Sequence, residues 1–231
     1  FPIEGYIETS GSNGITTRRP FTSSYTVIEP IATVAPTLTN VLYAGIDNEI
    51  EISVPGIVQQ DVNATMTGGT LTRRGNKWFA RPTTVGQNST LSISAHLPSG
   101  EIRTIAVKEF RVRALPDPTP YIEYSAANGN AVMFKGGGIQ KSVLMNTGEL
   151  KAAIDDGILS IPFKVIHFRT VFFDSMGNAI PEVSEGNRFS ERQKKQISRL
   201  VRGNYFYISG VKAVGPDGTE REIAVMEVRV Q

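Results

Sequence analysis

A run of three alternating prolines constrains this chain more than any other feature. Pro116, Pro118 and Pro120 follow Glu109–Arg113, where apolar and charged residues alternate as in a half-buried strand. Each proline lacks a backbone donor and biases the residue before it toward extended conformations. The chain should therefore leave a sheet and continue as a stiff, polyproline-like linker over residues 116–120. We interpret four residues as an interdomain joint: Leu115, Pro116, Pro118 and Pro120.

Short β-prone segments separated by turn signals fill residues 31–115. Residues 49–54 and 91–96 alternate apolar with polar side chains, and Gly, Asn and Pro clusters lie between the segments. Turns recur about every 8 to 12 residues, without helical periodicity. This spacing predicts an immunoglobulin-like β-sandwich, so the chain should be mainly β.

After the linker the pattern predicts a smaller α+β domain over residues 121–231, an antiparallel sheet with two short helices. The strands are expected at 121–124, 132–134, 163–173, 205–214 and 221–230. One helix is expected over 147–155, with Asn146 as its N-cap and Gly157 near its end. The other is expected over 191–201, where Ser190 and Gln193 match a capping box and Gly203 follows.

Residues 1–30 hold two β-prone stretches around a strong turn signal at residues 10–14. A lone hairpin is only marginally stable in water. This segment is therefore expected to be the end of a preceding β domain, to pair with the next domain, or to intertwine with a second copy of the chain.

Composition narrows the classes of function. The net charge is only +2, from 24 basic and 22 acidic residues, which gives no support for nucleic-acid binding. There are no cysteines, which removes disulfides and thiolate chemistry. No apolar run approaches the roughly 18 residues of a spanning helix. Because the chain opens at Phe1 without a signal pattern, we expect a piece of a longer protein whose targeting segment lies upstream.

Motifs for catalysis, cofactors and metals are missing from the sequence. His96 and His167 have no partner at metal-ligand spacing, and no serine lies in a Gly-x-Ser-x-Gly elbow. The glycines at 136–138 lack the ending of a phosphate loop and fit a flexible break better. Asp155, Asp156 and Asp174 are interpreted as solvated turn residues. We therefore expect no enzyme, no cofactor and no metal.

One helix carries the main concentration of positive charge. Its apolar residues Ile197, Leu200 and Val201 would dock on one side and leave basic residues outward. An ordinary solvated helix face explains this, and so does a docking surface for an acidic partner. The candidate docking residues are Arg188, Arg192, Lys195, Arg199 and Arg202, with Lys194 beside them and Glu191 as the single acid.

Five runs of residues carry a resemblance to a known family. They are Val-Leu-Tyr-Ala-Gly-Ile-Asp-Asn-Glu-Ile at 41–50, Ser-Val-Pro-Gly at 53–56, Gly-Gly-Thr-Leu at 68–71, Trp-Phe-Ala-Arg-Pro at 78–82 and Phe-Arg-Val-Arg-Ala-Leu-Pro-Asp-Pro at 110–118. These runs resemble the C-terminal periplasmic region of the GldM/PorM family, gliding-motility and type IX secretion proteins of Bacteroidetes, most specifically over residues 32–121.

The resemblance implies a non-enzymatic structural role in the periplasm, in a protein anchored in the inner membrane by an upstream helix. It implies an elongated homodimeric shaft that couples a GldL/PorL-type inner-membrane motor to an outer-membrane-associated GldK–GldN complex. The alternative from another class is a surface adhesin or carbohydrate-binding sandwich module, for which Trp78 and Phe79 would be the stacking platform. An alternating strand around Trp78 favours a core position instead.

Overall fold

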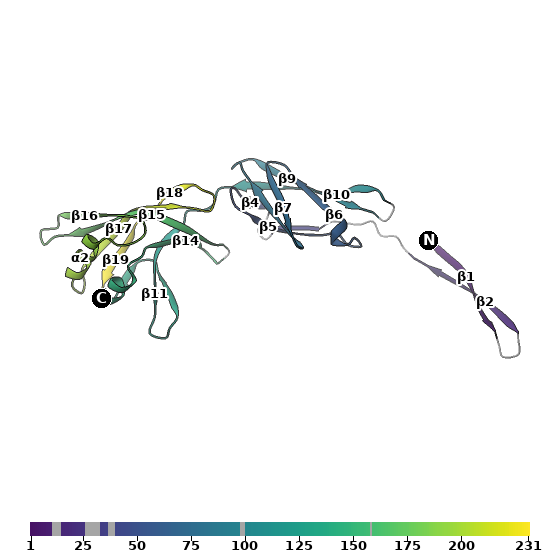
Figure 1. The fold of residues 1–231 in the computed structure, drawn as a ribbon, viewed down its shortest axis with the longest axis horizontal. Coiled ribbons are helices and arrows are strands. Elements are labelled where there is room, and N and C mark those ends of the chain that lie inside the picture. The colour runs from purple at the N-terminus through teal and green to yellow at the C-terminus, as the bar shows by residue number, and fades with distance from the viewer. Residues whose placement is uncertain (11–14, 26–32, 37–39, 98–99, 158) are drawn as a thin grey trace.

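The computed structural model describes residues 1–10, 15–25, 33–36, 40–97, 100–157 and 159–231. Three parts follow one another along the chain: an N-terminal hairpin, a β-sandwich and a C-terminal α+β domain (Figure 1). The sandwich and the C-terminal domain lie end to end in this view, and the N-terminus and the C-terminus lie on opposite sides of the sandwich. The parts are therefore arranged in a row rather than around one core.

The hairpin consists of β1 (Pro2–Ser10) and β2 (Thr16–Ser24), paired antiparallel along their full length. Its side chains are exposed throughout except for the half-buried Gly5. Phe1 and Tyr25 stack with ring centroids 5.4 Å apart, and Phe21 packs against Gly5. Part of the expected turn and the end of the second stretch lie outside the described residues. The hairpin is thus a two-stranded element with both faces open to solvent.

Two four-stranded sheets form the sandwich that the sequence predicts. One sheet has the order β3-β5-β8-β7 and the other β4-β10-β9-β6. Taken as A-B-E-D and G-F-C, with β4 added beside β10, this order is that of an immunoglobulin constant-type domain. The bounds are β3 (Thr33–Pro36), β4 (Val41–Tyr43), β5 (Asn48–Ser53), β6 (Val62–Met66), β7 (Gly69–Arg74), β8 (Lys77–Pro82), β9 (Asn88–His96) and β10 (Ile102–Arg113), with a short 3-10 turn at Gln59–Asp61.

Alternation along each strand builds the core of the sandwich. In β5, Ile50 and Ile52 point inward while Glu49 and Glu51 face solvent, which is the period-two pattern of a strand with one buried face. Side chains from both sheets meet in one cluster: Leu42, Ile50, Ile52, Val54, Val62, Ala64, Trp78, Ala80, Leu91, Ile93 and Phe110. The expected sandwich is therefore present, and Trp78 is part of its core.

The C-terminal domain has a larger sheet of nine strands, which is antiparallel except where β13 runs beside β19. The C-terminal domain, which was expected to be the smaller of the two, therefore has the larger sheet. The strands are β11 (Thr119–Ser125), β12 (Ala131–Phe134), β13 (Gly137–Ile139), β14 (Lys151–Asp155), β15 (Ser160–Phe173), β16 (Ala179–Glu185), β17 (Tyr205–Val214), β18 (Glu220–Ile223) and β19 (Met226–Val230). The helices in the described residues are α1 (Lys141–Thr147) and α2 (Glu191–Arg199).

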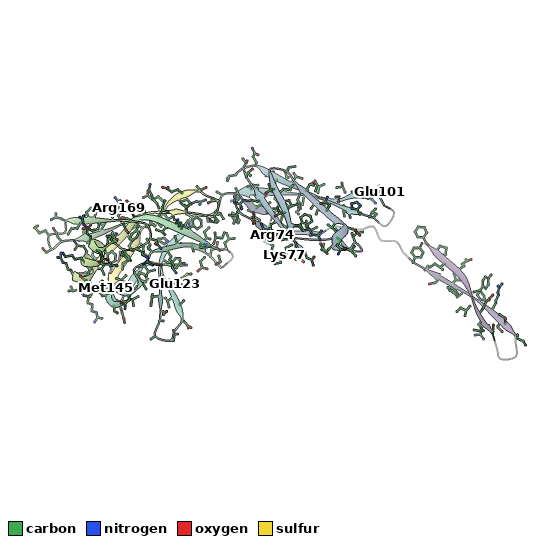
Figure 2. The ribbon with its side chains drawn as sticks, viewed as in Figure 1. Arg74, Lys77, Glu101, Glu123, Met145 and Arg169 are labelled. Carbon is green, nitrogen blue, oxygen red and sulfur yellow. The ribbon has the colours of Figure 1, made fainter. Side chains whose placement is uncertain are left out.

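Both helices cover the same core. Leu144 from α1 and Ile197 from α2 join Phe168, Phe172 and Phe206 of the sheet in one buried cluster. Figure 2 shows Met145, on α1, at the lower edge of this domain and Arg169, on β15, at its upper edge. Residues of β15 and β17 that alternate with the buried ones, such as Phe173 and Tyr205, remain partly exposed. One face of this part of the sheet is therefore packed and the other is accessible.

The helix expected over residues 147–155 is wrong. The helix lies one element earlier, at Lys141–Thr147, and Gly148 ends it in the left-handed conformation at φ 58°. Residues 151–155 form β14, which pairs with β11 on one side and β15 on the other. Ala152 and Ile154 are buried in this interior strand, so tertiary pairing overrides their helical spacing. Sequence spacing alone could not reveal that pairing.

The glycines at 136–138 do not act as a plain flexible break, because Gly137 and Gly138 pair with β19. Gly136 and Gly137 adopt φ 130° and 97°, which L-residues rarely reach, and Gly138 lies against the Gln231 side chain. The glycines allow this short strand to join the edge of the sheet.

Candidate functional site

The linker between the domains is packed rather than free. Leu115 is buried and belongs to the core cluster of the C-terminal domain. Pro118 and Pro120 are also buried, and Pro120 lies within β11 opposite Ala152, whereas Pro116 is exposed. The connection between β10 and β11 thus holds Leu115, Pro116 and Pro118, whereas Pro120 belongs to the C-terminal sheet. Two of the three prolines fix the chain by packing as well as by stiffness.

Arg221 is the centre of a charged cluster beside this linker. Its guanidinium donates two hydrogen bonds to Asp217, from Nη1 to Oδ1 at 3.2 Å and from Nη2 to Oδ2 at 2.6 Å. Its Nε lies 3.6 Å from Oδ1 of Asp117 in the linker, and its Cζ lies 5.4 Å from the ring centroid of Phe163. The side chains of Arg221 and Asp217 are 12% and 9% exposed. A forked, mostly buried pair of this kind holds its geometry more tightly than a surface ion pair.

The sandwich contacts this cluster through the turn between β4 and β5. Gly45 has φ 76°, and a Cβ at this position would lie 2.7 Å from Cβ of Asp217. Tyr43 and Ile46, on either side, are half-buried and pack against the core of the C-terminal domain. The two domains therefore meet at a contact that has room for a glycine and for no larger residue.

Asn48 holds the turn in shape. Its side-chain oxygen accepts the backbone N–H of Tyr43 at 2.8 Å. Its amide nitrogen donates to the carbonyls of Tyr43, Ile46 and Ala80 at 2.8, 3.0 and 3.0 Å. One side chain thus ties the turn to itself and to β8. We call the four residues at the contact between the two domains and the linker the clasp: Gly45, Asp117, Asp217 and Arg221.

The Asp217 carboxyl is held in its charged form. Burial acts to raise its pKa, but the hydrogen bonds from Arg221, the backbone N–H of Thr219 and the Arg221 charge outweigh burial. The pKa of Asp217 consequently lies below its ordinary value of 3.8. The Asp217 carboxylate is therefore ionised at neutral pH and paired with the positive charge of Arg221.

The basic residues of α2 form a second candidate site. Ser190 and Gln193 make the predicted capping box, and Gln193 and Ile197 are buried against the sheet. The helix ends at Arg199, so Arg202 lies in the loop beyond it. Arg188 donates to Glu149 at 2.6 Å. On α2 and in the loop after it, four exposed basic side chains make no hydrogen bond or ion pair with the described residues: Arg192, Lys195, Arg199 and Arg202. We call these four residues the basic ridge.

The basic ridge is a surface of uncompensated charge. Lys194, on the same helix, is paired with Glu191 at 2.9 Å, so not every cation of α2 is free. Exposed ion pairs contribute little to stability, and unpaired cations contribute less. The side chains of the ridge can therefore bind another molecule without any loss of contacts that stabilise the fold.

The remaining candidate residues from the sequence occupy ordinary strand, turn and core positions. His167 lies 3.5 Å from Glu185, and His96 is exposed at the end of β9. Asp174 accepts the backbone N–H groups of Met176 and Asn178 and the Asn178 amide, the role of a turn residue. Trp78 is 5% exposed and cannot stack on a sugar. Within the described residues, no group of three or more His, Cys, Asp or Glu side chains could hold a metal ion.

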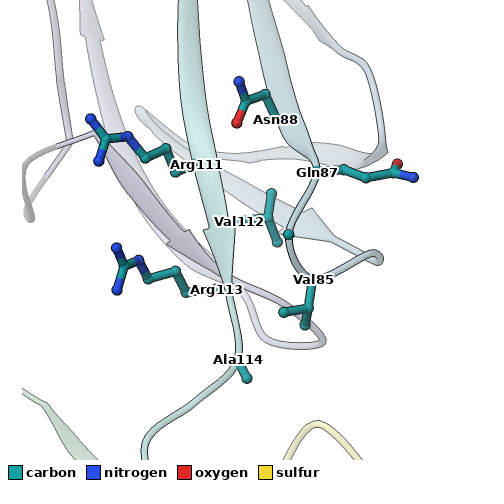
Figure 3. Close-up of a pocket in the computed structure, with 8 residues that line it drawn as sticks. Val85, Gln87, Asn88, Arg111, Val112, Arg113 and Ala114 are labelled. Carbon is teal, nitrogen blue, oxygen red and sulfur yellow. The ribbon is translucent and has the colours of Figure 1, made fainter.

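A cavity of about 460 Å³ lies where β10 leaves the sandwich (Figure 3). Arg111 and Arg113 point to one side of β10, away from Val85 and Gln87. These residues do not converge on a common point, and both arginines are exposed. The cavity therefore has none of the focused polar groups of an active site.

Sequence reasoning missed the clasp. Gly45 precedes the β-prone segment at 49–54, and Pro216–Gly218 lie between the strands expected at 205–214 and 221–230, and nothing in the sequence indicates that the two places touch. The available signal was Arg221, an arginine four residues after Asp217 in the strand that follows a Pro-Asp-Gly turn. That spacing allows a local ion pair, but the contact with the other domain required the structure.

Comparison with known protein families gives two matches that together span both domains. Residues 31–113 match the family described as GldM third domain, and residues 116–231 match the GldM C-terminal domain. The chain belongs to the GldM family. The two matches end and begin on either side of Ala114 and Leu115, at the linker. GldM proteins are structural components of gliding motility and type IX secretion, and theirs is not a known enzyme family. Their C-terminal domains are periplasmic.

A search of curated proteins finds no match. A solved structure titled "Structures of Clostridium thermocellum CbhA fibronectin(III)-like modules" is similar at 13% identity and a TM-score of 0.29, covering 87% of this chain and 94% of that one. Among the described residues, no helix has the length and apolar character needed to cross a membrane.

Proposed function

We propose that this chain is the distal part of a non-enzymatic, dimeric shaft of the gliding and type IX secretion machinery. In this proposal an upstream region anchors the protein in the inner membrane and meets a GldL/PorL-type motor. The C-terminal domains meet the GldK–GldN-type complex at the outer membrane. No nucleic acid takes part. Membership of the GldM family supports the setting, and the joint between the domains supports the mechanical role.

The clasp is the observation that carries the proposal. A shaft transmits displacement only if its segments do not rotate freely about their linkers, and domains in one chain move relative to each other unless their interface is specific. Here Arg221 bridges the linker and the β17–β18 turn, and Gly45 brings the sandwich against that same turn. The buried prolines add a linker with few accessible conformations. The two domains therefore move as one segment.

The basic ridge is the proposed electrostatic docking surface for the outer-membrane-associated complex, together with Arg188. It faces solvent on α2 of the C-terminal domain, at the end of the molecule away from the hairpin (Figure 1). Four cations without partners favour a partner surface rich in carboxylates. Such a surface speeds association and orients the partner more than it adds affinity.

The N-terminal hairpin is the proposed site of contact between two copies of the chain or with the domain before it. Its exposed apolar side chains include Phe1, Tyr6 and Ile7, at 71%, 68% and 56%. A two-stranded element with this much open apolar surface needs a further layer to be stable. A second copy supplies one without any additional protein.

The test is made in cells that depend on this protein for secretion. The full-length protein carries Arg221→Ala, and secretion of a substrate is measured beside capture of the outer-membrane complex. The proposal predicts a large fall in secretion with capture retained, because the loosened joint still presents the basic ridge. The control is Arg229→Ala, a 60% exposed arginine on β19. Normal secretion with Arg221→Ala, despite a demonstrably loosened joint, would overturn the mechanical role.

A further inference from the structure

A groove lies at the end of the C-terminal domain beside the basic ridge. Its volume is about 660 Å³, and it runs between the β15–β16 turn and the loop that joins α2 to β17. The lining residues are Phe173, Asp174, Ser175, Gly177, Leu200, Gly203, Asn204 and Tyr205. None of these lining residues belongs to the clasp or to the basic ridge.

An aromatic cluster continues from the groove across the open face of the sheet. Phe173 and Tyr205 have ring centroids 5.4 Å apart, and Tyr207 lies 5.8 Å from Tyr205 and 6.1 Å from Phe173. Their neighbours in sequence, Phe172 and Phe206, stack on the buried side. Phe173 and Tyr205 remain 36% and 43% exposed. Partly exposed aromatic clusters next to a concave surface are typical of protein-binding sites.

Further apolar side chains project from the two loops that form the walls. Met176 is 83% exposed in the β15–β16 turn, and Val201 is 62% exposed in the α2–β17 loop. Neither belongs to the domain core. The groove thus has Phe173 and Tyr205 in its lining and an exposed apolar side chain next in sequence to each of its two loops' lining residues, which suits one inserted apolar or aromatic side chain.

Hydrogen bonds hold both walls in place. In the β15–β16 turn, Asp174 accepts from the backbone of Met176 and Asn178 at 2.8 Å, and Gly177 donates to the Asp174 carbonyl at 3.0 Å. The Asn178 amide also donates to Asp174, and together with the backbone donors it lowers the pKa of that carboxyl. The one carboxylate of the groove is therefore occupied by donors from its own turn.

The opposite wall is held by Lys141 and Asn204. The Lys141 ammonium caps the end of α2 by donating to the carbonyls of Ser198 and Leu200 at 3.2 and 2.9 Å. Asn204 accepts the backbone N–H of Val201 at 2.9 Å and returns a bond to the Val201 carbonyl at 3.0 Å. A groove with both walls fixed loses little conformational freedom when it is filled.

Two arginines are next in sequence to residues that line the groove. Arg199 and Arg202 flank Leu200 and Gly203 in sequence, and both belong to the basic ridge, whose side chains have no partner in the described structure. A groove that combines an apolar interior with unpaired arginines at its rim complements a segment that combines an apolar anchor with carboxylates. Two copies that meet groove to groove would bring the same arginines together, which disfavours that arrangement.

We propose that this distal groove binds an aromatic side chain on an acidic segment of a partner protein. The inference rests on the proposed function and deepens it, because it adds an anchoring pocket to the electrostatic docking of the basic ridge. The aromatic ring lies against Phe173 and Tyr205, and the flanking carboxylates reach Arg199 and Arg202. The groove then supplies affinity and register, while the rest of the ridge supplies orientation.

The experiment uses the chain of residues 1–231 and the peptide acetyl-Asp-Glu-Phe-Glu-Asp-amide as probe. Amide chemical shifts are followed by NMR during titration, and binding is expected to move the signals of Gly177, Gly203 and Asn204. Replacing the peptide phenylalanine by alanine should weaken binding at least about 5-fold, as loss of an anchor does. Replacing its acidic residues by Asn and Gln should weaken it by a similar factor, about 5-fold, through loss of charge complementarity.

Protein variants test the place of binding. Ser175→Trp, at an exposed lining position, fills the groove and should abolish the titration without lowering the melting temperature. Ser125→Trp, at an exposed end of β11, is the control and should bind as the original chain does. Shifts centred elsewhere, equal affinity for the alanine peptide, or full binding by Ser175→Trp would each overturn the proposal. Shifts of the groove amides with protein concentration alone would show that a second copy fills it, and would overturn the proposal too.

Capture of the outer-membrane-associated complex separates failure of this inference from failure of the proposed function. If Lys195→Glu weakens capture and Ser175→Trp does not, the groove is not the anchor and the docking role of the ridge stands. If both variants capture the complex normally, the docking role itself fails. If both variants weaken capture, and Ser175→Trp weakens it as much as it weakens peptide binding, both stand.

Discussion

Arg221 and the arginines of the basic ridge carry the same guanidinium group in opposite surroundings. Arg221 is 12% exposed and contacts two carboxylates and a phenyl ring. Arg192 and Arg199 are exposed and make no side-chain hydrogen bond in the described structure. A group whose donors are satisfied internally stabilises the fold, whereas one whose donors are open is available to a partner. The difference separates the residues that hold the shaft together from those that connect it to the rest of the machine.

The largest effect is expected from Arg221→Ala. The change leaves Asp217 mostly buried without its partner, and breaking such a pair costs on the order of 3 kcal/mol. Urea unfolding monitored by circular dichroism, which follows both domains, measures the loss. The matching change at the basic ridge, Arg199→Ala, should alter stability by less than about 0.5 kcal/mol. Equal effects at the two sites would contradict the distinction between them.

Gly45→Ala should open the contact between the domains. The new Cβ would lie 2.7 Å from Asp217, and the left-handed backbone adds strain, for a combined cost of about 2 kcal/mol. Gly56→Ala is a matched control, because Gly56 has φ 79° and no atom within 4 Å of the added Cβ. In small-angle scattering, the distribution of interdomain distances should therefore broaden for Gly45→Ala and stay unchanged for Gly56→Ala. The same profile for both variants would show that Gly45 matters only for its own turn.

The basic ridge is tested by two adjacent lysines of α2. Lys195→Glu reverses an unpaired charge and should weaken capture of the outer-membrane-associated complex by about 10-fold, with the melting temperature unchanged. Lys194→Glu makes the same change at a residue paired with Glu191, and should leave capture intact while slightly lowering stability. Pull-down with the purified complex measures both. Undiminished capture by Lys195→Glu would remove the ridge from the docking surface.

Acidification should weaken the clasp before it unfolds the sandwich. The pKa of Asp217 is lowered in the folded chain, so the unfolded chain binds more protons near pH 3.8 and folded stability rises with pH there. The contribution is complete above that pH and is lost as the pH falls through the lower, folded pKa. Interdomain scattering should broaden as the pH falls below 3.8, and Asp217→Asn should remove this pH dependence. Asp174→Asn should leave it unchanged, because Asp174 lies in the distant β15–β16 turn.

Much of the fold could be predicted from local patterns. The alternation around Ile50 and Ile52, the turn glycines and the Ser190 capping box each depend on residues close in sequence, and the structure has them as expected. The segment around Ala152 was misassigned because its fate is decided by strands β11 and β15, which lie far away in sequence. Local preference is a weak guide in an interior strand.

The candidate sites show the same limit. The basic residues of α2 are visible in the sequence as a cluster, and so are the linker prolines. The contact of Gly45 with Asp217 joins residues from two domains, and no periodicity or motif links them. The distal groove likewise combines a turn after β15 with a loop after α2. Sites formed by one segment could be predicted, and those formed by two required the structure.

The most direct test of a rigid joint is the distance distribution across it. Because the chain has no cysteine, spin labels can be placed cleanly at Thr72→Cys on the sandwich and Ser125→Cys on the C-terminal domain, both at exposed positions. Pulsed electron spin resonance should give one narrow distribution, which is retained in Pro116→Gly and broadened strongly by Arg221→Ala. A broad distribution in the otherwise unaltered chain would contradict the claim that the clasp makes the two domains a single segment.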